Sequence, residues 1–206
     1  MKPGKNPMRE IITILFDNFE TLDLFGPIEI LGRLKNHFHV NFFSREGGII
    51  ISSQDVPVLT KPMADLSKSK GVLLIPGGIG TIELVRDKAF IKSLKSLSER
   101  AEYILTVCTG SILFSKTGLL NGRKATCNKR LFSLTAAETP EVIWMKKARW
   151  VKDGNIYSSS GISAGIDMTL GFVADLLGHN IAKQQGIEIE YDWKEDAEWD
   201  PFSDLY

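Results

Sequence analysis

Short apolar runs alternate with longer stretches of helical periodicity along most of this chain. The runs are rich in Val, Ile, Leu and Phe, as strands buried on both faces are. They cover residues 11–16, 39–44, 72–75, 103–107 and 156–158. The stretches between them place apolar residues three and four positions apart, as amphipathic helices do. This alternation predicts an α/β fold with a mostly parallel sheet and helices on both faces.

Turn and capping residues divide these segments. Asp87 is a suitable N-cap for one helix and Gly178 a suitable C-cap for another. Gly26 and Pro27 predict an interruption of the helix over 22–34, because proline lacks a backbone N–H. Asp153-Gly154 between two apolar runs predicts a β-hairpin. Residues 47–52 are expected to extend the second strand as a hairpin.

Length and composition predict one folded unit. The chain has 206 residues, of which 43% are hydrophobic and 24% charged, which suffices for one substantial core. We expect a flexible N-terminus over 1–9, a single domain over 10–192 and an acidic, Trp-containing tail over 193–206. Two interpretations of the tail stay open. It covers the functional site or a dimer partner, or it is solvated with two anchoring aromatic residues.

The charge balance argues against several kinds of partner. Lys plus Arg equals Asp plus Glu at 25 each, so we expect no nucleic-acid and no membrane partner, and a small-molecule substrate instead. Two cysteines without a Cys/His cluster predict a reducing compartment and no metal. A cytoplasmic location follows from the lack of a secretory or membrane-spanning segment. The Gly77–Gly80 stretch departs from the dinucleotide fingerprint at Glu83, so no cofactor is expected.

Cys108 is the most informative residue. The strand over 103–107 delivers it directly to an expected helix start, in the order Val-Cys-Thr-Gly-Ser. A strand ending in a sharp turn exposes the side chain at the turn, and the N–H groups of the following helix favour a thiolate. The pattern is a cysteine relative of the serine nucleophile elbow. The alternative is a small, buried apolar cysteine without chemistry.

Two other strand ends are expected beside Cys108. Ligands of an open parallel sheet bind beyond the carboxyl ends of its strands, where strand order reverses. The first strand leads towards Asp23, and the 72–75 strand opens into Gly77 and Gly78. The N–H group of Gly78 or Thr109 would stabilise negative charge on a substrate. Alternatively, the glycines form only a tight turn.

Asp23 is the candidate proton-transfer residue. The histidines, His37, His39 and His179, are expected away from Cys108, on the surface or at helix ends. Apolar neighbours surround Asp23 in the sequence, and burial raises a carboxyl pKa towards the range useful for acid and base catalysis. The alternative is a first-turn aspartate that stabilises the helix dipole.

Five segments resemble the ThiJ/PfpI superfamily, in the same order along the chain. They are Leu22–Pro27, Ile75–Gly78, Val107–Ser111, Gly118–Thr126 and Gly161–Asp167. The first and last are most similar to isonitrile (isocyanide) hydratases and to the amidase-like domains of certain AraC-type regulators. The resemblance implies a flavodoxin-like three-layer sandwich, a homodimer, and an enzyme without cofactor.

The resemblance also implies roles for individual residues. Cys108 would be the nucleophile that forms a thioimidate with an isocyanide, and Asp23 would supply a proton and activate water. Gly77, Gly78 and Thr109 would contact the substrate. A hydro-lyase that makes N-substituted formamides is the expected function. A deglycase or glyoxalase-like activity on reactive carbonyls and a non-enzymatic oxidant sensor at Cys108 are the alternatives.

The chain departs from the superfamily pattern in two places. After Thr126 the hydratase and regulator branches continue Thr-His-Trp, whereas this chain has Cys127-Asn128-Lys129. The peptidase branch places histidine directly after the nucleophile, whereas this chain has Thr109, which argues against peptidase activity. Cys127 is either a buried strand residue or a resolving thiol for Cys108.

Overall fold

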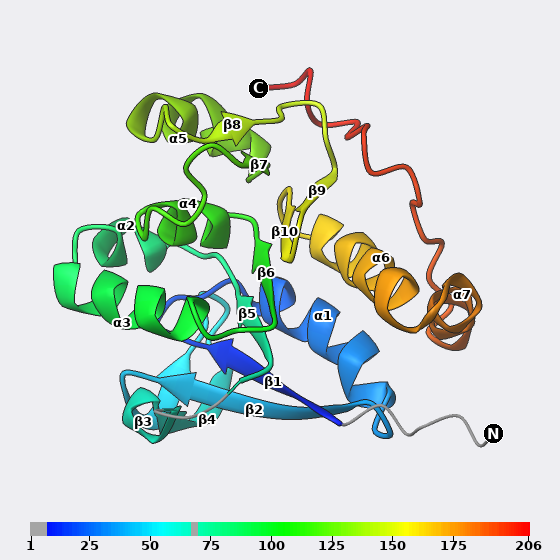
Figure 1. Ribbon diagram of the computed structural model, residues 1–206, viewed down its shortest axis with the longest axis horizontal. Helices are drawn as coiled ribbons and strands as arrows, with labels where there is room; N and C mark the ends of the chain where they lie inside the picture. Colours follow the sequence, from blue (N-terminus) through cyan, green and yellow to red (C-terminus); the bar gives the residue numbers. More distant parts are fainter. Residues whose placement is uncertain (1–7, 67–69) are drawn as a thin grey trace.

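An eight-stranded sheet of order β3-β4-β2-β1-β5-β6-β10-β9 forms the centre of the computed structural model, which describes residues 8–66 and 70–206 (Figure 1). Its strands are β1 (Arg9–Ile14), β2 (Phe38–Ser44), β3 (Glu46–Ile51), β4 (Pro57–Pro62), β5 (Val72–Ile75), β6 (Tyr103–Val107), β9 (Trp150–Asp153) and β10 (Ile156–Ser159). A small second sheet pairs β7 (Lys124–Ala125) with β8 (Ile143–Trp144).

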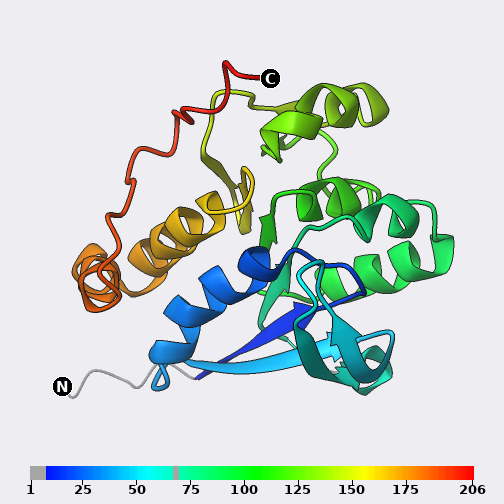
Figure 2. The same cartoon turned by 180° about the vertical axis from the view of Figure 1, so that it is seen from behind.

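Helices cover both faces of the large sheet. They are α1 (Thr21–Arg33), α2 (Thr81–Leu84), α3 (Lys88–Ser98), α4 (Gly110–Ser115), α5 (Phe132–Glu138), α6 (Ala164–Leu177) and α7 (His179–Glu188), with 3-10 turns η1 (Met63–Leu66) and η2 (Lys129–Leu131). Figures 1 and 2 show α1, α6 and α7 on one face and α2, α3 and α4 on the other. The expected three-layer α/β sandwich is therefore confirmed.

The strand pairing brings several carboxyl ends to one edge. The pairs β1 with β2, β1 with β5, β5 with β6, and β6 with β10 are all parallel. All four residues of β5 are buried, because helices cover both sides of the central strands. The segments that follow β5, β6 and β10 consequently lie together, and strand order reverses beside β1.

Several predictions from local sequence are confirmed. The strands over 72–75 and 103–107 have the expected bounds. The Asp87 carboxylate caps α3 by accepting a hydrogen bond from the Phe90 N–H at 2.9 Å. Gly154 has a φ of 61° in the turn between β9 and β10, and Gly178 ends α6 with a φ of 107°.

Two predictions were wrong. Helix α1 runs through Pro27 without a break, because a proline in the second turn leaves only the carbonyl four residues earlier, that of Asp23, without its helical partner. Strand β3 does not extend β2. It pairs antiparallel with β4, and β4 lies between β3 and β2, an arrangement that the pattern of β4 did not indicate.

The expected flexible segment over 1–9 falls largely outside the described residues, since 1–7 are not described. Arg9 already belongs to β1, where its N–H donates to the His37 carbonyl at 2.8 Å. Its guanidinium pairs with Glu102 at 2.7 Å. Within the described residues, no helix has the length and apolar character to cross a membrane.

Candidate active site

Cys108 occupies a sharp turn between β6 and α4. Its φ of 57° lies in the left-handed region, which non-glycine residues rarely adopt. The Cys108 N–H donates to the Ser159 carbonyl at 3.2 Å, which ties the turn to the end of β10. The residue is only 5% exposed. A strained, almost buried cysteine at the end of a central strand is typical of a functional site rather than of ordinary core packing.

Asp23 lies in the first turn of α1 and is completely buried, at 0% exposed. Its Oδ2 accepts a hydrogen bond from the Gly77 N–H at 3.0 Å. Its Oδ1 is buried and has no hydrogen-bond partner among the described residues. A buried carboxyl oxygen without a partner is costly, which marks Asp23 as a candidate for chemistry rather than for structural support.

Gly77 and Gly78 hold the site together. A Cβ on Gly77 would lie 2.5 Å from Thr109 Oγ1 and 2.8 Å from Asp23 Oδ2, so only glycine fits between them. The Gly78 N–H donates to Thr109 Oγ1 at 2.8 Å. The structure thus brings all five predicted site residues together. The N–H groups of both glycines are engaged by Asp23 and Thr109, which differs from the expectation that Gly78 offers a free donor.

Asn128 completes the surroundings of the sulfur, and the sequence reasoning missed it. Its Nδ2 donates to Cys108 Sγ at 3.1 Å, and its Oδ1 accepts from the Arg130 N–H at 2.9 Å, which fixes the amide orientation. Asn128 stands where the similar branches have histidine. This departure from the superfamily pattern could have indicated a functional role for Asn128. The residue type alone did not reveal its contact with Cys108, which lies 20 positions earlier in the chain.

Burial dominates the electrostatics of Asp23 and Cys108. It raises the pKa of Asp23 well above its usual range, although the Gly77 N–H and the Cys108 side chain oppose this. Burial also raises the pKa of the Cys108 thiol, and the Asp23 carboxylate raises it further, while Asn128 and the Thr109 N–H lower it. The expectation that a helix start favours the thiolate is corrected, because burial outweighs a helix as short as α4. Burial therefore makes both the Cys108 thiol and the neighbouring Asp23 carboxyl hold their protons more strongly than they would in water.

His39 and His179 lie apart from this pair, and Cys127 is a second buried thiol. His39 in β2 lies opposite Glu10 in the register of β1 and β2, at the amino end of β1. The His179 ring lies 5.5 Å from that of Trp193. Cys127 is free and fully buried, and burial raises the pKa of its thiol to about 12. Among residues 8–66 and 70–206, no group of three or more His, Cys, Asp or Glu side chains is arranged to hold a metal ion.

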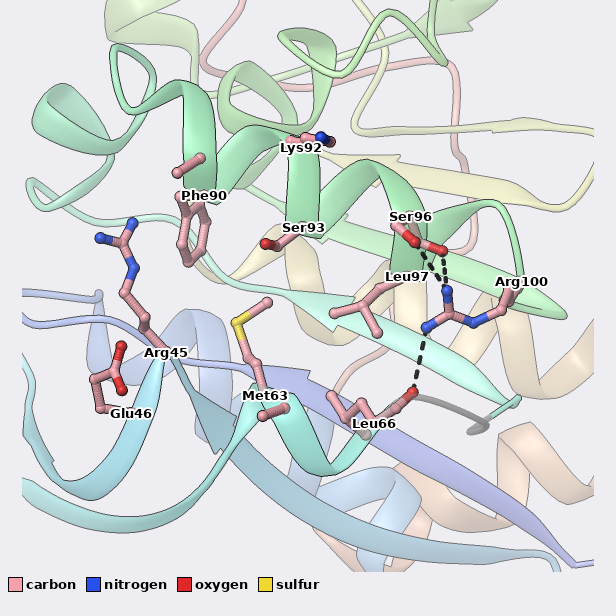
Figure 3. A pocket seen from close by; sticks show the side chains of 12 residues that line it. Arg45, Glu46, Met63, Leu66, Phe90, Lys92, Ser93, Ser96, Leu97 and Arg100 are labelled. Atoms are coloured by element: carbon pink, nitrogen blue, oxygen red, sulfur yellow. Dashed lines mark hydrogen bonds between the residues drawn. The ribbon is translucent and has the colours of Figure 1, made fainter.

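A separate cavity of about 550 Å³ lies between α3 and the β3–η1 region (Figure 3). Both of its arginines are already engaged. Arg100 donates to the Leu66 carbonyl at 3.2 Å and to the Ser96 carbonyl at 2.7 Å. Arg45 pairs with Asp87 and lies over the Phe90 ring, 5.3 Å from its centre. None of the five predicted site residues lines this cavity.

Comparison with known proteins identifies the family of this chain. Residues 9–175 match the DJ-1/PfpI family. Isonitrile hydratase from Pseudomonas putida is 30% identical over 180 residues, which cover 86% of this chain and 76% of the hydratase. The transcriptional regulator CdhR of Pseudomonas aeruginosa is 24% identical over 83% of this chain, which spans only 52% of that regulator. A ThiJ/PfpI family protein from Pseudomonas syringae superposes with a TM-score of 0.83 at 26% identity, covering 93% of this chain and 78% of that protein. The chain belongs to the DJ-1/PfpI family.

Proposed function

We propose that this protein adds water to an isocyanide and releases an N-substituted formamide, with Cys108 as nucleophile and Asp23 as proton-transfer residue. The observation that carries the proposal is the buried Asp23 carboxyl with its unpartnered Oδ1 beside the Cys108 thiol. The similarity to isonitrile hydratase supports the choice of substrate class. The substrate is a small molecule, and the mechanism involves only side chains of this chain and water.

In the first half-reaction, Cys108 Sγ bonds to the terminal carbon of the isocyanide. Asp23 as carboxylate accepts the thiol proton through Oδ1 and passes it to the same carbon, which leaves a neutral thioimidate. Because burial raises the pKa of Asp23 well above its usual range, its carboxylate holds the transferred proton more strongly than an exposed carboxylate would. Asn128 donates to the sulfur and stabilises the negative charge that develops there.

In the second half-reaction, water adds to the thioimidate carbon. Asp23 removes one proton from the water and delivers it to the substrate nitrogen, which gives a neutral tetrahedral intermediate. The carbon–sulfur bond then breaks as the hydroxyl becomes a carbonyl, and the hydroxyl proton returns to Cys108 through Asp23. The products are the formamide and the original thiol, so atoms and charge balance.

The occupied backbone donors favour an isocyanide over a carbonyl substrate. Attack on a carbonyl produces an oxyanion that needs free N–H donors. Here the N–H groups of Gly77 and Gly78 are engaged by Asp23 and Thr109, and the Thr109 N–H is engaged by the Cys108 sulfur. Attack on an isocyanide carbon instead requires a proton, which Asp23 supplies. The raised pKa of Cys108 also weighs against an oxidant sensor, since peroxide reacts with thiolates.

The test is turnover of an aryl isocyanide to its formamide by the purified protein, with methylglyoxal as the parallel substrate. We expect formamide from the wild-type protein and none from Cys108→Ser. Cys127→Ser is the matched control, because its buried thiol lies outside the proposed chemistry, and it should retain turnover. Turnover of methylglyoxal alone would replace this proposal by a carbonyl activity. Inactivity on both, with stoichiometric oxidation of Cys108 by dilute peroxide, would favour the sensor.

A further inference from the structure

A cavity of about 380 Å³ lies beside Cys108, separated from the sulfur by its own lining residues. Two of these lining residues border the sulfur. Asn128 donates to Sγ at 3.1 Å, and a Cβ on Gly161 would lie 3.2 Å from it. Leu22, which precedes Asp23 in α1, also lines this cavity. The cavity is therefore the approach to the thiol from the side of Asn128 and Gly161.

The far side of this cavity is made by residues from the end of the described chain. Phe202 and Tyr206 both line it. Their side chains are partly open, with 47% of Phe202 and 55% of Tyr206 exposed. Together with Leu22 and Ile162 they give the entrance an apolar, aromatic wall. Aromatic rings in this position offer flat surface for stacking with an apolar group of the substrate.

The segment that carries these rings runs from α7 back to the start of β9, as the red trace of Figure 1 shows, and backbone hydrogen bonds attach it there. The Ala197 carbonyl accepts hydrogen bonds from the N–H groups of Arg149 at 2.8 Å and Trp150 at 3.3 Å. The Asp200 N–H donates to the Lys147 carbonyl at 2.7 Å. These bonds anchor the segment over 193–206 to the domain, although most of its residues are exposed.

A tight turn then directs the Phe202 ring. The side chain of Asp200 is completely buried, and its Oδ1 accepts from the Phe202 N–H at 2.9 Å. The Ser203 N–H donates to the Asp200 carbonyl at 3.0 Å, and Ser203 is itself buried. The backbone of Phe202 is thus fixed between two buried residues, which places its side chain at the cavity.

The same turn is coupled to the residue that follows Asn128. The Lys129 ammonium is buried and donates to Thr126 Oγ1 at 2.8 Å and to the Ala148 carbonyl at 2.6 Å. Burial lowers the pKa of Lys129 to about 8, and the negative charge of Asp200 opposes this decrease. Asp200 therefore lies within electrostatic range of Lys129, next to the amide that contacts the sulfur.

We infer that Phe202 and Tyr206 are specificity-determining residues, which select substrates with an aryl or bulky apolar group on the reacting isocyanide. This rests on the proposed function for the identity of the reacting group, but the wall itself acts on any electrophile that reaches Cys108. A small alkyl substituent makes few contacts with the two rings. An aryl substituent stacks on them while its reactive carbon lies at the sulfur.

The first test compares kcat and KM for an aryl and a methyl isocyanide. We expect Phe202→Ala and Tyr206→Ala each to raise KM for the aryl substrate by about 3- to 10-fold, the effect of losing one aromatic contact. The kcat values and the methyl substrate should change little. Leu205→Ala is the matched control, since Leu205 belongs to the same segment, is 67% exposed and does not line the cavity.

A second test does not require turnover. N-phenylmaleimide and N-methylmaleimide carry the same reactive group, and their rates of addition to Cys108 can be followed by mass spectrometry of the Cys108 peptide. We expect the phenyl-to-methyl rate ratio to fall by about 3- to 10-fold in Phe202→Ala, and less in Phe202→Leu, which keeps apolar bulk. An unchanged ratio in both folded variants would overturn the inference. A changed ratio without isocyanide turnover would support the wall and contradict the proposed function.

Discussion

Asp23 and Asp167 are both completely buried, but their surroundings differ. Both oxygens of Asp167 are engaged. Its Oδ2 accepts from Arg149 Nε at 2.7 Å and from the Tyr191 hydroxyl at 3.0 Å, and its Oδ1 accepts from the Lys194 N–H at 2.9 Å. Asp23 has a single backbone donor and one oxygen without a partner.

Asp167 is a carboxylate that stabilises the fold, whereas Asp23 is a candidate for chemistry. Asp167 binds α6 to β9 and to the segment after α7, and its charge is compensated by Arg149 at 2.6 Å. Burial raises the pKa of both carboxyls, but the Lys194 N–H and Arg149 oppose the rise at Asp167. Asp23 has no cation as a hydrogen-bond partner among the described residues, and burial raises its pKa well above the usual range. A buried acid that is left half-satisfied is an unstable arrangement, which is why such groups cluster at functional sites.

The largest expected effect is on catalysis. Asp23→Asn preserves shape but removes the group that transfers protons, so kcat for isocyanide hydration should fall by about 10²- to 10⁴-fold. The free energy of unfolding should not decrease at neutral pH. Steady-state kinetics and urea unfolding measure the two quantities. Asp17→Asn, at an exposed carboxylate, is the control, and an Asp23→Asn variant with normal kcat would remove Asp23 from the mechanism.

The second prediction concerns the contribution of the Asp167–Arg149 pair to stability. Arg149→Leu leaves Asp167 buried without its cation, which should cost about 3–5 kcal/mol of unfolding free energy in urea titrations. Lys152→Leu breaks the exposed pair with Asp175 and should cost less than about 1 kcal/mol. Equal losses in the two variants would mean that the Asp167 pair is not the anchor described above.

The pH dependence of the unfolding free energy reports the raised pKa of Asp23. A carboxyl whose pKa is higher in the folded than in the unfolded protein contributes stability at pH values below its unfolded pKa, and this contribution is lost as pH rises through the folded pKa. For Asp23 the loss should approach about 1.4 kcal/mol per pH unit between the two pKa values. Urea unfolding of wild type and Asp23→Asn across this range should show the variant gaining relative stability with pH. Parallel curves would show that the pKa of Asp23 is not raised.

The smallest effect concerns the sulfur. Asn128→Ala removes one hydrogen bond to Cys108 Sγ, worth about 1 kcal/mol or roughly a fivefold change. We expect the pH–rate profile for alkylation of Cys108 by iodoacetamide to move to higher pH. Asn155→Ala, which loses a hydrogen bond to the Glu102 carbonyl at 3.1 Å, is the control and should keep the wild-type profile. An unchanged pH–rate profile would show that Asn128 does not affect the pKa of the Cys108 thiol.

Local sequence was sufficient for many elements of the fold. The β5 and β6 runs, the Asp87 cap and the Asp153-Gly154 turn each depend on residues close together in the chain, so their patterns are visible without a structure. Strand β4 and helix α7 were not predicted. Strand β4 has the sequence Val-Leu-Thr-Lys between two prolines, without alternation of polar and apolar residues, and α7 has a weak apolar face, so neither pattern was distinctive.

The elbow cysteine and its neighbouring carboxyl were candidates from the sequence because a strand end, a helix start and their residue types are local features. The raised pKa of Cys108, its contact with Asn128 and the wall formed by Phe202 were decided by tertiary structure. These properties depend on burial and on contacts between segments remote in sequence. Desolvation is set by everything that surrounds a group in space, which is why no window of sequence around Cys108 contains it.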